Sequence, residues 1–242
     1  MTLQKSRSMF EGSMSRIKAA AKKWRRSLFE LAGSDRYSRF ALNNLDRKLA
    51  VHVPFRNGVF IEAGANDGLT QSNTYWFERF RGWRGILIEP VPSKAQACRR
   101  NRPNSTVVNT ALVSSENVKT VRMKTANLMA FVANSFSKLE DEKRHLDLAI
   151  SVQSLRSVEE IEVPARRLSA IMDDLGVVHV DLLSLDVEGY EIEALRGMDT
   201  ARHRPTFILV ETKDIEGVLQ VLSQRYKVVE KLSYHDYLLQ TS

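Results

Sequence analysis

The sequence predicts an α/β fold with a mostly parallel sheet, and two patterns of residues carry that prediction. From about residue 57 onward, short apolar runs are separated by segments that are helical in pattern or rich in turn residues. The runs contain β-branched and bulky side chains and do not alternate with polar residues, which is typical of strands covered on both faces. Alternation of such strands with helices indicates a parallel sheet.

The expected strands and helices follow in order along the chain. Five apolar runs are the expected parallel strands: 59–61, 86–88, 106–108, 180–185 and 207–210. The expected helices between them are 70–80, 92–101, 168–175 and 190–196. The tail predicts an antiparallel hairpin at one sheet edge, formed by 226–231 and 235–240. Two further strand-like segments, 118–123 and 160–163, bracket a polar helical stretch.

Residues 1–56 predict a helical N-terminal extension that precedes a domain of residues 57–242. Apolar residues recur at spacings of three and four, as on one face of a helix: Met14, Ile17, Ala21, Trp24, Leu28 and Leu31. Gly33 is expected to end this helix. A second helix is expected from residue 35 to about residue 51, ending before Pro54.

The net charge of +7 is confined to the first part of the extension. Residues 1–26 contain eight Lys and Arg against one Glu, which leaves 28 basic and 28 acidic residues for the rest of the chain. The pI of about 9.6 therefore reflects an N-terminal arm rather than a binding face of the domain. The segment 14–31 fits a basic amphipathic helix on an anionic membrane surface, or a helix packed on its own domain or on a partner.

The composition argues against several classes of protein, namely secreted, membrane-spanning, disulfide-bonded and zinc-binding proteins. No apolar segment predicts a secretory signal or a membrane span. The single cysteine, Cys98, excludes an internal disulfide and a thiolate zinc site, so we expect a reducing, cytoplasmic location, with contact at the inner membrane surface as a further option. The five histidines show no metal-binding spacing, and no metal is expected, although paired carboxylates leave a divalent cation open.

The segments that follow the first two strands predict a nucleoside-containing ligand. The first strand leads into residues 62–68, with glycines at 64 and 68, and the second ends in Glu89. An acidic residue in that place accepts hydrogen bonds from a ribose diol. Asn66 stands where a dinucleotide fingerprint needs its second glycine, and no P-loop motif occurs. A ligand with a ribose but no phosphate fits, and S-adenosylmethionine is such a ligand.

Four stretches resemble the FkbM family of S-adenosylmethionine-dependent methyltransferases: 59–68, 88–92, 183–191 and 195–197. The resemblance extends over about residues 57–240. It implies a class I methyltransferase (Rossmann-like) fold, with a seven-stranded sheet whose last strand is antiparallel. It also implies methyl transfer to a hydroxyl oxygen, often on a sugar or a secondary metabolite, and the first carbohydrate it suggests is the fucose of a lipochitooligosaccharide.

The same resemblance implies the residues that bind the cofactor. Those expected to line the methionine part are Glu62, Gly64, Asn66 and Gly68. Glu89 is expected at the ribose, and the segment from Asn109 to Ala111 is expected near the adenine.

The candidate catalytic residues are carboxylates at the ends of the fourth and fifth strands. Asp186 and Glu188 follow the fourth strand and Glu211 follows the fifth, so they are expected to face one crevice. Asp186 is the first candidate to take a proton from the acceptor or to orient it, and Glu211 is the alternative base. Two structural roles remain open: Asp186 as a cap of the following helix, and Glu188 as a carboxylate in that helix's first turn.

These observations predict an O-methyltransferase that acts on a carbohydrate or a similar small hydroxylated molecule. Two alternatives are a nucleic-acid methyltransferase that uses the basic arm and a non-catalytic module that keeps the fold as an interaction surface. Against nucleic acid, residues 186–189 read Asp-Val-Glu-Gly where amino-methylating enzymes show Asp or Asn, two prolines and an aromatic residue, and the domain has no basic stripe.

Overall fold

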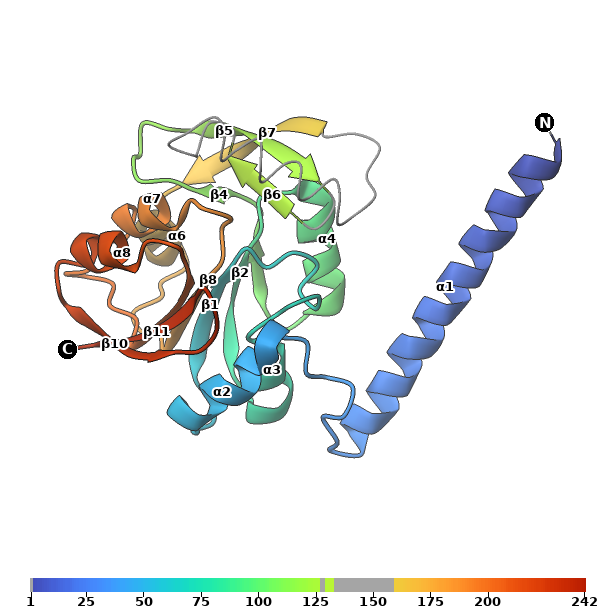
Figure 1. Ribbon diagram of the computed structural model, residues 1–242, viewed down its shortest axis with the longest axis horizontal. Helices are drawn as coiled ribbons and strands as arrows, with labels where there is room; N and C mark the ends of the chain where they lie inside the picture. Colours follow the sequence, from blue (N-terminus) through green and yellow to red (C-terminus); the bar gives the residue numbers. More distant parts are fainter. Residues whose placement is uncertain (1, 127–128, 133–158) are drawn as a thin grey trace.

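The structure is a computed structural model that describes residues 2–126, 129–132 and 159–242 (Figure 1). Its centre is a seven-stranded sheet in the order β10-β11-β9-β8-β1-β2-β3. The strands are β1 (Val59–Ala63), β2 (Arg84–Ile88), β3 (Thr106–Val108), β8 (Leu182–Leu185), β9 (Phe207–Glu211), β10 (Tyr226–Lys231) and β11 (Asp236–Thr241). β11 pairs antiparallel with both neighbours, while the other pairs of the sheet are parallel. The predicted class I methyltransferase fold, with its antiparallel C-terminal hairpin, is confirmed.

Helices cover both faces of this sheet, which explains why its strands are continuously apolar. One buried cluster joins β1, β2, β8 and β9 to the helices α6 (Leu168–Asp174), α7 (Glu191–Arg196) and α8 (Ile215–Val221). The other joins the opposite face to α2 (Leu45–His52), α3 (Tyr75–Arg81) and α4 (Pro92–Asn101). A two-faced core of this kind excludes water from the centre of the sheet and leaves the strand ends to form a site.

A second, four-stranded sheet in the order β4-β7-β5-β6 lies beyond one end of the first (Figure 1). Its strands are β4 (Ala111–Leu112), β5 (Thr120–Ala126), β6 (Met129–Val132) and β7 (Glu159–Arg166). β7 contains the predicted segment 160–163, and β5 contains residues 120–123 of the predicted segment 118–123; the two strands pair antiparallel with each other. The polar helical stretch expected between them lies mainly outside the described residues.

Two predicted helices are wrong in part: the first is interrupted by two residues with positive φ, and the second is shortened by hydrogen bonds to Glu62. Residues 35–41 are not helical: a 3-10 turn, η1 (Leu42–Asn44), precedes α2, and Asn43 and Asn44 have positive φ values of 51° and 56°, which an α-helix does not allow. The helix expected from residue 70 begins only at Tyr75. The turn before it is held by Ser72 and by the backbone N–H of Asn73, which both donate to Glu62.

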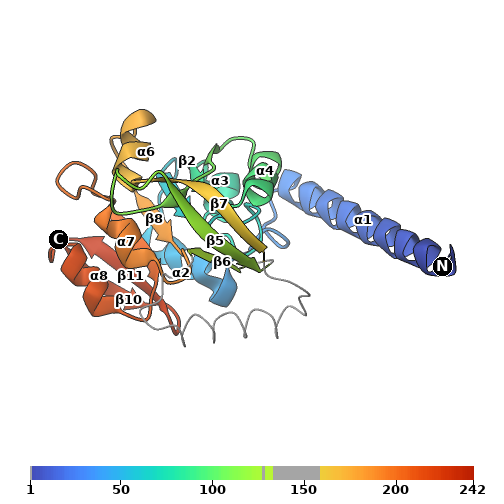
Figure 2. The ribbon, with the colours of Figure 1, turned by 90° about the horizontal axis from the view of Figure 1, so that it is seen from above.

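The N-terminal extension forms one long helix, α1 (Thr2–Leu31), that points away from the domain (Figures 1 and 2). It ends before Gly33, which has a φ of 74°, as predicted. The interpretation that its apolar stripe packs on the domain is wrong, because Ile17, Trp24 and Leu31 are 61%, 68% and 78% exposed. Within the described residues, no helix is long and apolar enough to cross a membrane.

Candidate active site

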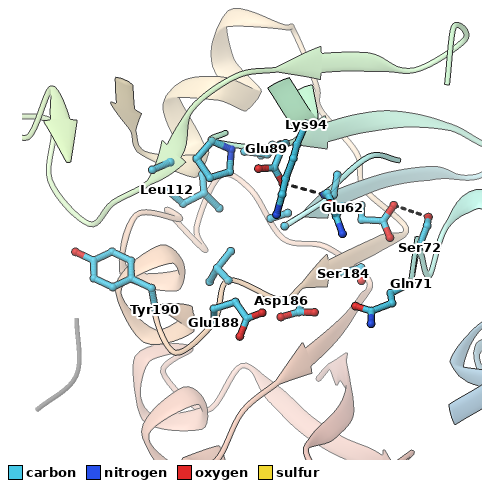
Figure 3. Close-up of a pocket in the computed structure, with 18 of the residues that line it drawn as sticks. Glu62, Gln71, Ser72, Glu89, Lys94, Leu112, Ser184, Asp186, Glu188 and Tyr190 are labelled. Carbon is cyan, nitrogen blue, oxygen red and sulfur yellow. Dashed lines mark hydrogen bonds between the residues drawn. The ribbon is translucent and has the colours of Figure 1, made fainter. Parts of the chain in front are cut away.

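A pocket opens where the ends of β1, β2 and β8 meet, beneath the second sheet (Figure 3). It holds about 870 Å³ of space, part of it open to solvent. Its walls come from the loops after those three strands, from the segment Thr70–Asn73, from α4, from β4 and from β5. Of the residues proposed from the sequence, it is lined by Glu62, Gly64, Asn66, Glu89, Ala111, Asp186 and Glu188.

Gly64 allows the ends of β1 and β8 to approach each other closely. Its φ is 83°, and a Cβ atom added there would lie 1.7 Å from the carbonyl oxygen of Asp186. The structure gives this glycine a specific role, because a side chain at this position would collide with the neighbouring backbone. Because Gly64 has no side chain, the backbone of Asp186 can lie against it, and Asp186 reaches the wall of the pocket.

Glu62 holds the segment that forms one wall of the pocket. It is almost fully buried, and its carboxylate accepts hydrogen bonds from Ser72 Oγ (2.9 Å), the Asn73 backbone N–H (2.7 Å) and Thr74 Oγ1 (2.7 Å). Arg102, also buried, lies 3.6 Å from the same carboxylate and pairs with Glu78. This network fixes the wall, since a buried carboxylate with several donors and a cation is held in one geometry.

Asn73 presents an acceptor that suits a ligand with N–H or O–H groups. Its Nδ2 donates to Ser184 Oγ (3.1 Å), and its side chain is only 9% exposed. Its Oδ1 has no hydrogen-bond partner in the described part of the chain. A buried amide oxygen without a donor is costly, so a bound ammonium or hydroxyl group would satisfy it.

Glu89 connects the loops that follow β1 and β2. Its Oε2 accepts from the Asn66 backbone N–H (2.8 Å) and its Oε1 from the Val91 backbone N–H (2.9 Å). Burial raises the pKa of this carboxyl, and the nearby charge of Lys94 opposes that shift. The carboxylate keeps lone pairs for a ribose diol, because each oxygen accepts more than one hydrogen bond.

Asp186 lies within a group of carboxylates that perturb one another. Burial, followed by the negative charges of Glu211, Glu188 and Glu191, raises the pKa of Asp186 well above its usual range. Burial, and then the charge of Asp236, raises the pKa of Glu211 to about 7. Near neutral pH these groups therefore hold a proton that isolated carboxylates would have lost, which is typical of functional sites.

The turn after β8 decides the two structural roles left open for its carboxylates. Tyr190 occupies the cap position of α7, and the backbone N–H groups of Val187 and Gly189 donate to Glu191. Glu191, not Asp186, thus stabilises the helix terminus. The helix starts at Glu191, so Glu188 is not in its first turn; with a φ of 56°, Glu188 lies in the preceding turn and faces the pocket.

Three proposed residues lie behind the pocket wall rather than on it. Gly68 packs against Arg102 and Cys98. Asn109 donates to the backbone carbonyls of Glu89 (2.8 Å) and Pro90 (2.7 Å), so it supports the loop at which the ribose was expected. Glu211 is outside the lining, but its negative charge contributes to the raised pKa of Asp186.

The pocket also contains residues that the sequence patterns did not reveal. They are Thr70, Gln71, Ser72, Asn73, Lys94, Leu112, Met123, Ser184 and Tyr190. Tyr190 directly follows the Asp-Val-Glu-Gly stretch, so its position next to the candidate catalytic residues is a sequence feature that indicates a place in the pocket. Among the described residues, no group of three or more His, Cys, Asp or Glu side chains is arranged to hold a metal ion.

Comparison with known proteins identifies the family. The model of the methyltransferase FkbM domain matches residues 62–239. The chain belongs to this family. A curated relative, the methyltransferase sdnD of Sordaria araneosa, is 23% identical over 222 residues, which cover 78% of this chain and 83% of that protein. As in the rest of the FkbM family, the methyl donor is S-adenosylmethionine, and the protein is an S-adenosylmethionine-dependent methyltransferase.

Solved structures give more distant similarities. A TehB-like S-adenosylmethionine-dependent methyltransferase from Corynebacterium glutamicum is 11% identical with a TM-score of 0.39, covering 93% of this chain and 96% of that one. The fibrillarin of Aeropyrum pernix, solved with natively bound S-adenosylmethionine, is 11% identical with a TM-score of 0.37, covering 82% of this chain and 75% of that one.

Two features of the pocket are suited to S-adenosylmethionine. The unsatisfied Asn73 Oδ1 suits the ammonium group of a methionine moiety, and the surplus of carboxylates around Asp186 suits a ligand with a positive sulfonium. Glu62, Asn66 and Glu89 line the same pocket and would contact the bound molecule.

Proposed function

We propose that this FkbM-family protein is an O-methyltransferase that acts on a hydroxyl group of a carbohydrate or a similar small hydroxylated metabolite. The observation that supports this proposal is the position and charge state of Asp186. Its carboxyl group lies on the pocket wall next to Glu188, and its pKa is raised. A carboxylate with a raised pKa is a stronger base than an ordinary one and suits an acceptor that is a very weak acid.

S-adenosylmethionine supplies an electrophilic methyl group on a positively charged sulfur. In the proposed step, the acceptor oxygen forms a bond to that carbon while the carbon to sulfur bond breaks, and the electron pair stays on sulfur. Asp186 takes the hydroxyl proton as the new bond forms, and it holds the oxygen in line with the carbon. The negative charge of Glu211 raises the pKa of Asp186, so Glu211 influences the pH at which Asp186 is ionised and can act as a base.

The lining of the pocket supports a hydroxyl-bearing acceptor rather than an apolar one. In the lining, Gln71 is exposed and Tyr190 is partly exposed, and both side chains can donate and accept hydrogen bonds. Leu112 and Met123 of the second sheet contribute apolar side chains to the same lining. Sugars present one apolar face and several hydroxyl groups, so this mixed lining is suited to them.

The acceptor is found by incubating the purified protein with donor labelled in the methyl group and a panel of acceptors. The panel contains free sugars, glycolipids, a fucosylated lipochitooligosaccharide, a fucose-free analogue and oligonucleotides. Label in a sugar-bearing acceptor, recovered as a base-stable methyl ether, supports the proposal. Label only in oligonucleotides, or methylation at nitrogen, overturns it, and donor binding without any transfer identifies a non-catalytic module.

The role of Asp186 is tested with Asp186→Asn, which keeps the shape of the side chain and removes its charge. We expect turnover to fall by roughly 100-fold or more, the scale of lost general-base catalysis, whereas donor affinity should fall by a smaller factor, because the charge removed from Asp186 also attracts the sulfonium. Asp174→Asn is the matched control, because Asp174 is an exposed aspartate on α6. Near-normal turnover of Asp186→Asn would transfer the role to Glu211, which Glu211→Gln then tests.

A further inference from the structure

The apolar stripe of α1 remains uncovered along the described part of the helix. Side chains from Met14 to Leu31 on this stripe are exposed, including Ile17, Trp24 and Leu28. Because successive residues of an α-helix are about 100° apart, the stripe occupies an arc of about 100°. An exposed apolar face of this length and regularity marks an interaction surface rather than scattered surface residues.

The contacts between α1 and the domain use a different face of the helix. Phe29 packs edge-on against Tyr37, with ring centroids 4.8 Å apart. Glu30 accepts hydrogen bonds from Tyr75 Oη (2.7 Å) and Arg79 Nε (2.9 Å), which ties the helix to α3. These contacts orient the last turn, and the helix extends away from the domain (Figure 2), while the stripe residues Ile17, Trp24 and Leu31 stay exposed.

The same helix carries the net charge of the protein. Residues 1–26 account for the whole +7, and residues 12–29 contain no acidic residue. Lys18, Lys22 and Lys23 are exposed. On a helical wheel, Lys18 lies about 40° beyond one edge of the stripe, Lys22 lies about 80° beyond the same edge, and Lys23 lies about 80° beyond the other edge. An apolar stripe bordered by cations is complementary to a surface that is apolar inside and negatively charged outside.

We propose that α1 lies on the surface of an anionic lipid bilayer. The stripe enters the boundary between headgroups and acyl chains, and the lysines face the lipid phosphates. Pairing with a second copy is disfavoured, because the stripe edges carry cations and no acidic residue in 12–29 could form salt bridges between two helices. Nucleic acid would use the cations but leave Ile17, Trp24 and Leu28 exposed to water.

The fluorescence of Trp24 provides a direct test on the intact protein. The other two tryptophans, Trp76 and Trp83, are buried, with exposed fractions of 7% and 2%. We expect the emission to shift to shorter wavelength when vesicles of phosphatidylcholine with about a third phosphatidylglycerol are added, and not with phosphatidylcholine alone. The variant Trp24→Phe should lose the shift and still sediment with the anionic vesicles.

Vesicle sedimentation with paired variants separates the apolar contribution to membrane binding from the cationic contribution. Trp24→Glu/Leu28→Glu should lower the bound fraction at least tenfold, whereas the control Val178→Glu/Tyr234→Glu, which changes side chains that are 92% and 88% exposed elsewhere, should not. All four positions are at the surface, so the thermal midpoint should stay unchanged in both variants.

Lys18→Glu/Lys22→Glu should lower the bound fraction by a similar factor, and the control Lys119→Glu/Lys227→Glu, with the same change of charge, should not. Failure to bind anionic vesicles, or binding that Trp24→Glu/Leu28→Glu leaves unchanged, overturns the proposal. A dimer in light scattering that this variant dissociates, without vesicle binding, assigns the stripe to a second copy instead. Salt-sensitive binding to oligonucleotides but not to vesicles assigns the arm to nucleic acid.

Discussion

Removing the charge of Glu211 should stabilise the protein at alkaline pH and have little effect at acidic pH. Burial and the charges of Asp236, Glu188 and Glu191 raise the pKa of Glu211 from 4.5 to about 7. In the unfolded chain these influences are absent, and the carboxyl ionises near its ordinary value. Between these two pH values the folded protein binds one proton more than the unfolded chain, so stability falls as pH rises from about 4.5 to about 7.

The size of the effect follows from the shift. A difference of one pKa unit corresponds to about 1.4 kcal/mol, so the full shift would correspond to about 3.4 kcal/mol. Glu211 lies at the end of its strand and is partly accessible, so solvent screening reduces the figure to about 1 to 3 kcal/mol. Above pH 7, Glu211→Gln should be more stable than the unmodified protein by that amount, because glutamine stays neutral.

The assay is urea unfolding followed by circular dichroism at pH 5 and at pH 8. A change in packing or hydrogen bonding caused by glutamine contributes equally at both pH values, so the difference between them isolates the charge. Glu216→Gln, on an exposed side chain of α8, is the control. If Glu211→Gln alters the unfolding free energy equally at pH 5 and pH 8, ionisation of Glu211 does not destabilise the folded protein, and the inferred repulsion among the carboxylates near Asp186 is wrong.

Three further predictions concern the backbone of the pocket, the ribose site and the N-terminal arm. Gly64→Ala should lower the unfolding free energy by roughly 3 kcal/mol, because its Cβ would meet the Asp186 carbonyl oxygen, whereas Gly176→Ala, with no atom within 4 Å of the new Cβ, should cost only about 1 kcal/mol; chemical denaturation measures both. In calorimetry, Glu89→Ala should weaken S-adenosylmethionine binding by about 1 to 3 kcal/mol, and unchanged affinity would remove Glu89 from the ribose site. Deletion of residues 2–24, which spares the contacts of Glu30, should leave donor affinity and the thermal midpoint unchanged; a loss of affinity in the folded variant would show that the arm shapes the pocket.

The central sheet could be predicted because its signal is local. Runs such as 59–61 and 207–210 are apolar on both faces, and only a strand between two helical layers buries both faces. Helix starts were less predictable, because side chains from distant segments decide them. Ser72 and Asn73 continue a helical pattern in the sequence, yet both donate to Glu62, and α3 begins only after them. The short α8, which contains Gly217, was not anticipated.

Part of the candidate site was predictable for a geometric reason. The ends of neighbouring parallel strands meet at one edge, so Glu62, Glu89 and Asp186 could be assigned to one crevice from their positions after apolar runs. The remaining lining depends on partners that no local pattern encodes. Met123 reaches the pocket only because β5 lies above the sheet edge, and Asn73 faces it only because Glu62 holds its backbone.

The electrostatics of the pocket connect its stability to its chemistry. The domain of residues 57–242 carries 23 basic and 25 acidic residues, and its acidic residues Asp186, Glu188, Glu211 and Asp236 gather at one sheet edge, where burial and neighbouring negative charges raise the pKa of Asp186 and of Glu211. Because Asp186 and Glu211 are raised in pKa by burial and by neighbouring negative charges, ionising both of them costs folding free energy. A positive sulfonium bound beside these carboxyls would lower their pKa values and so favour the ionised form of Asp186. In the proposed reaction, Asp186 would thus become available as a base when the donor is bound, and a group of buried carboxylates suits a cationic ligand.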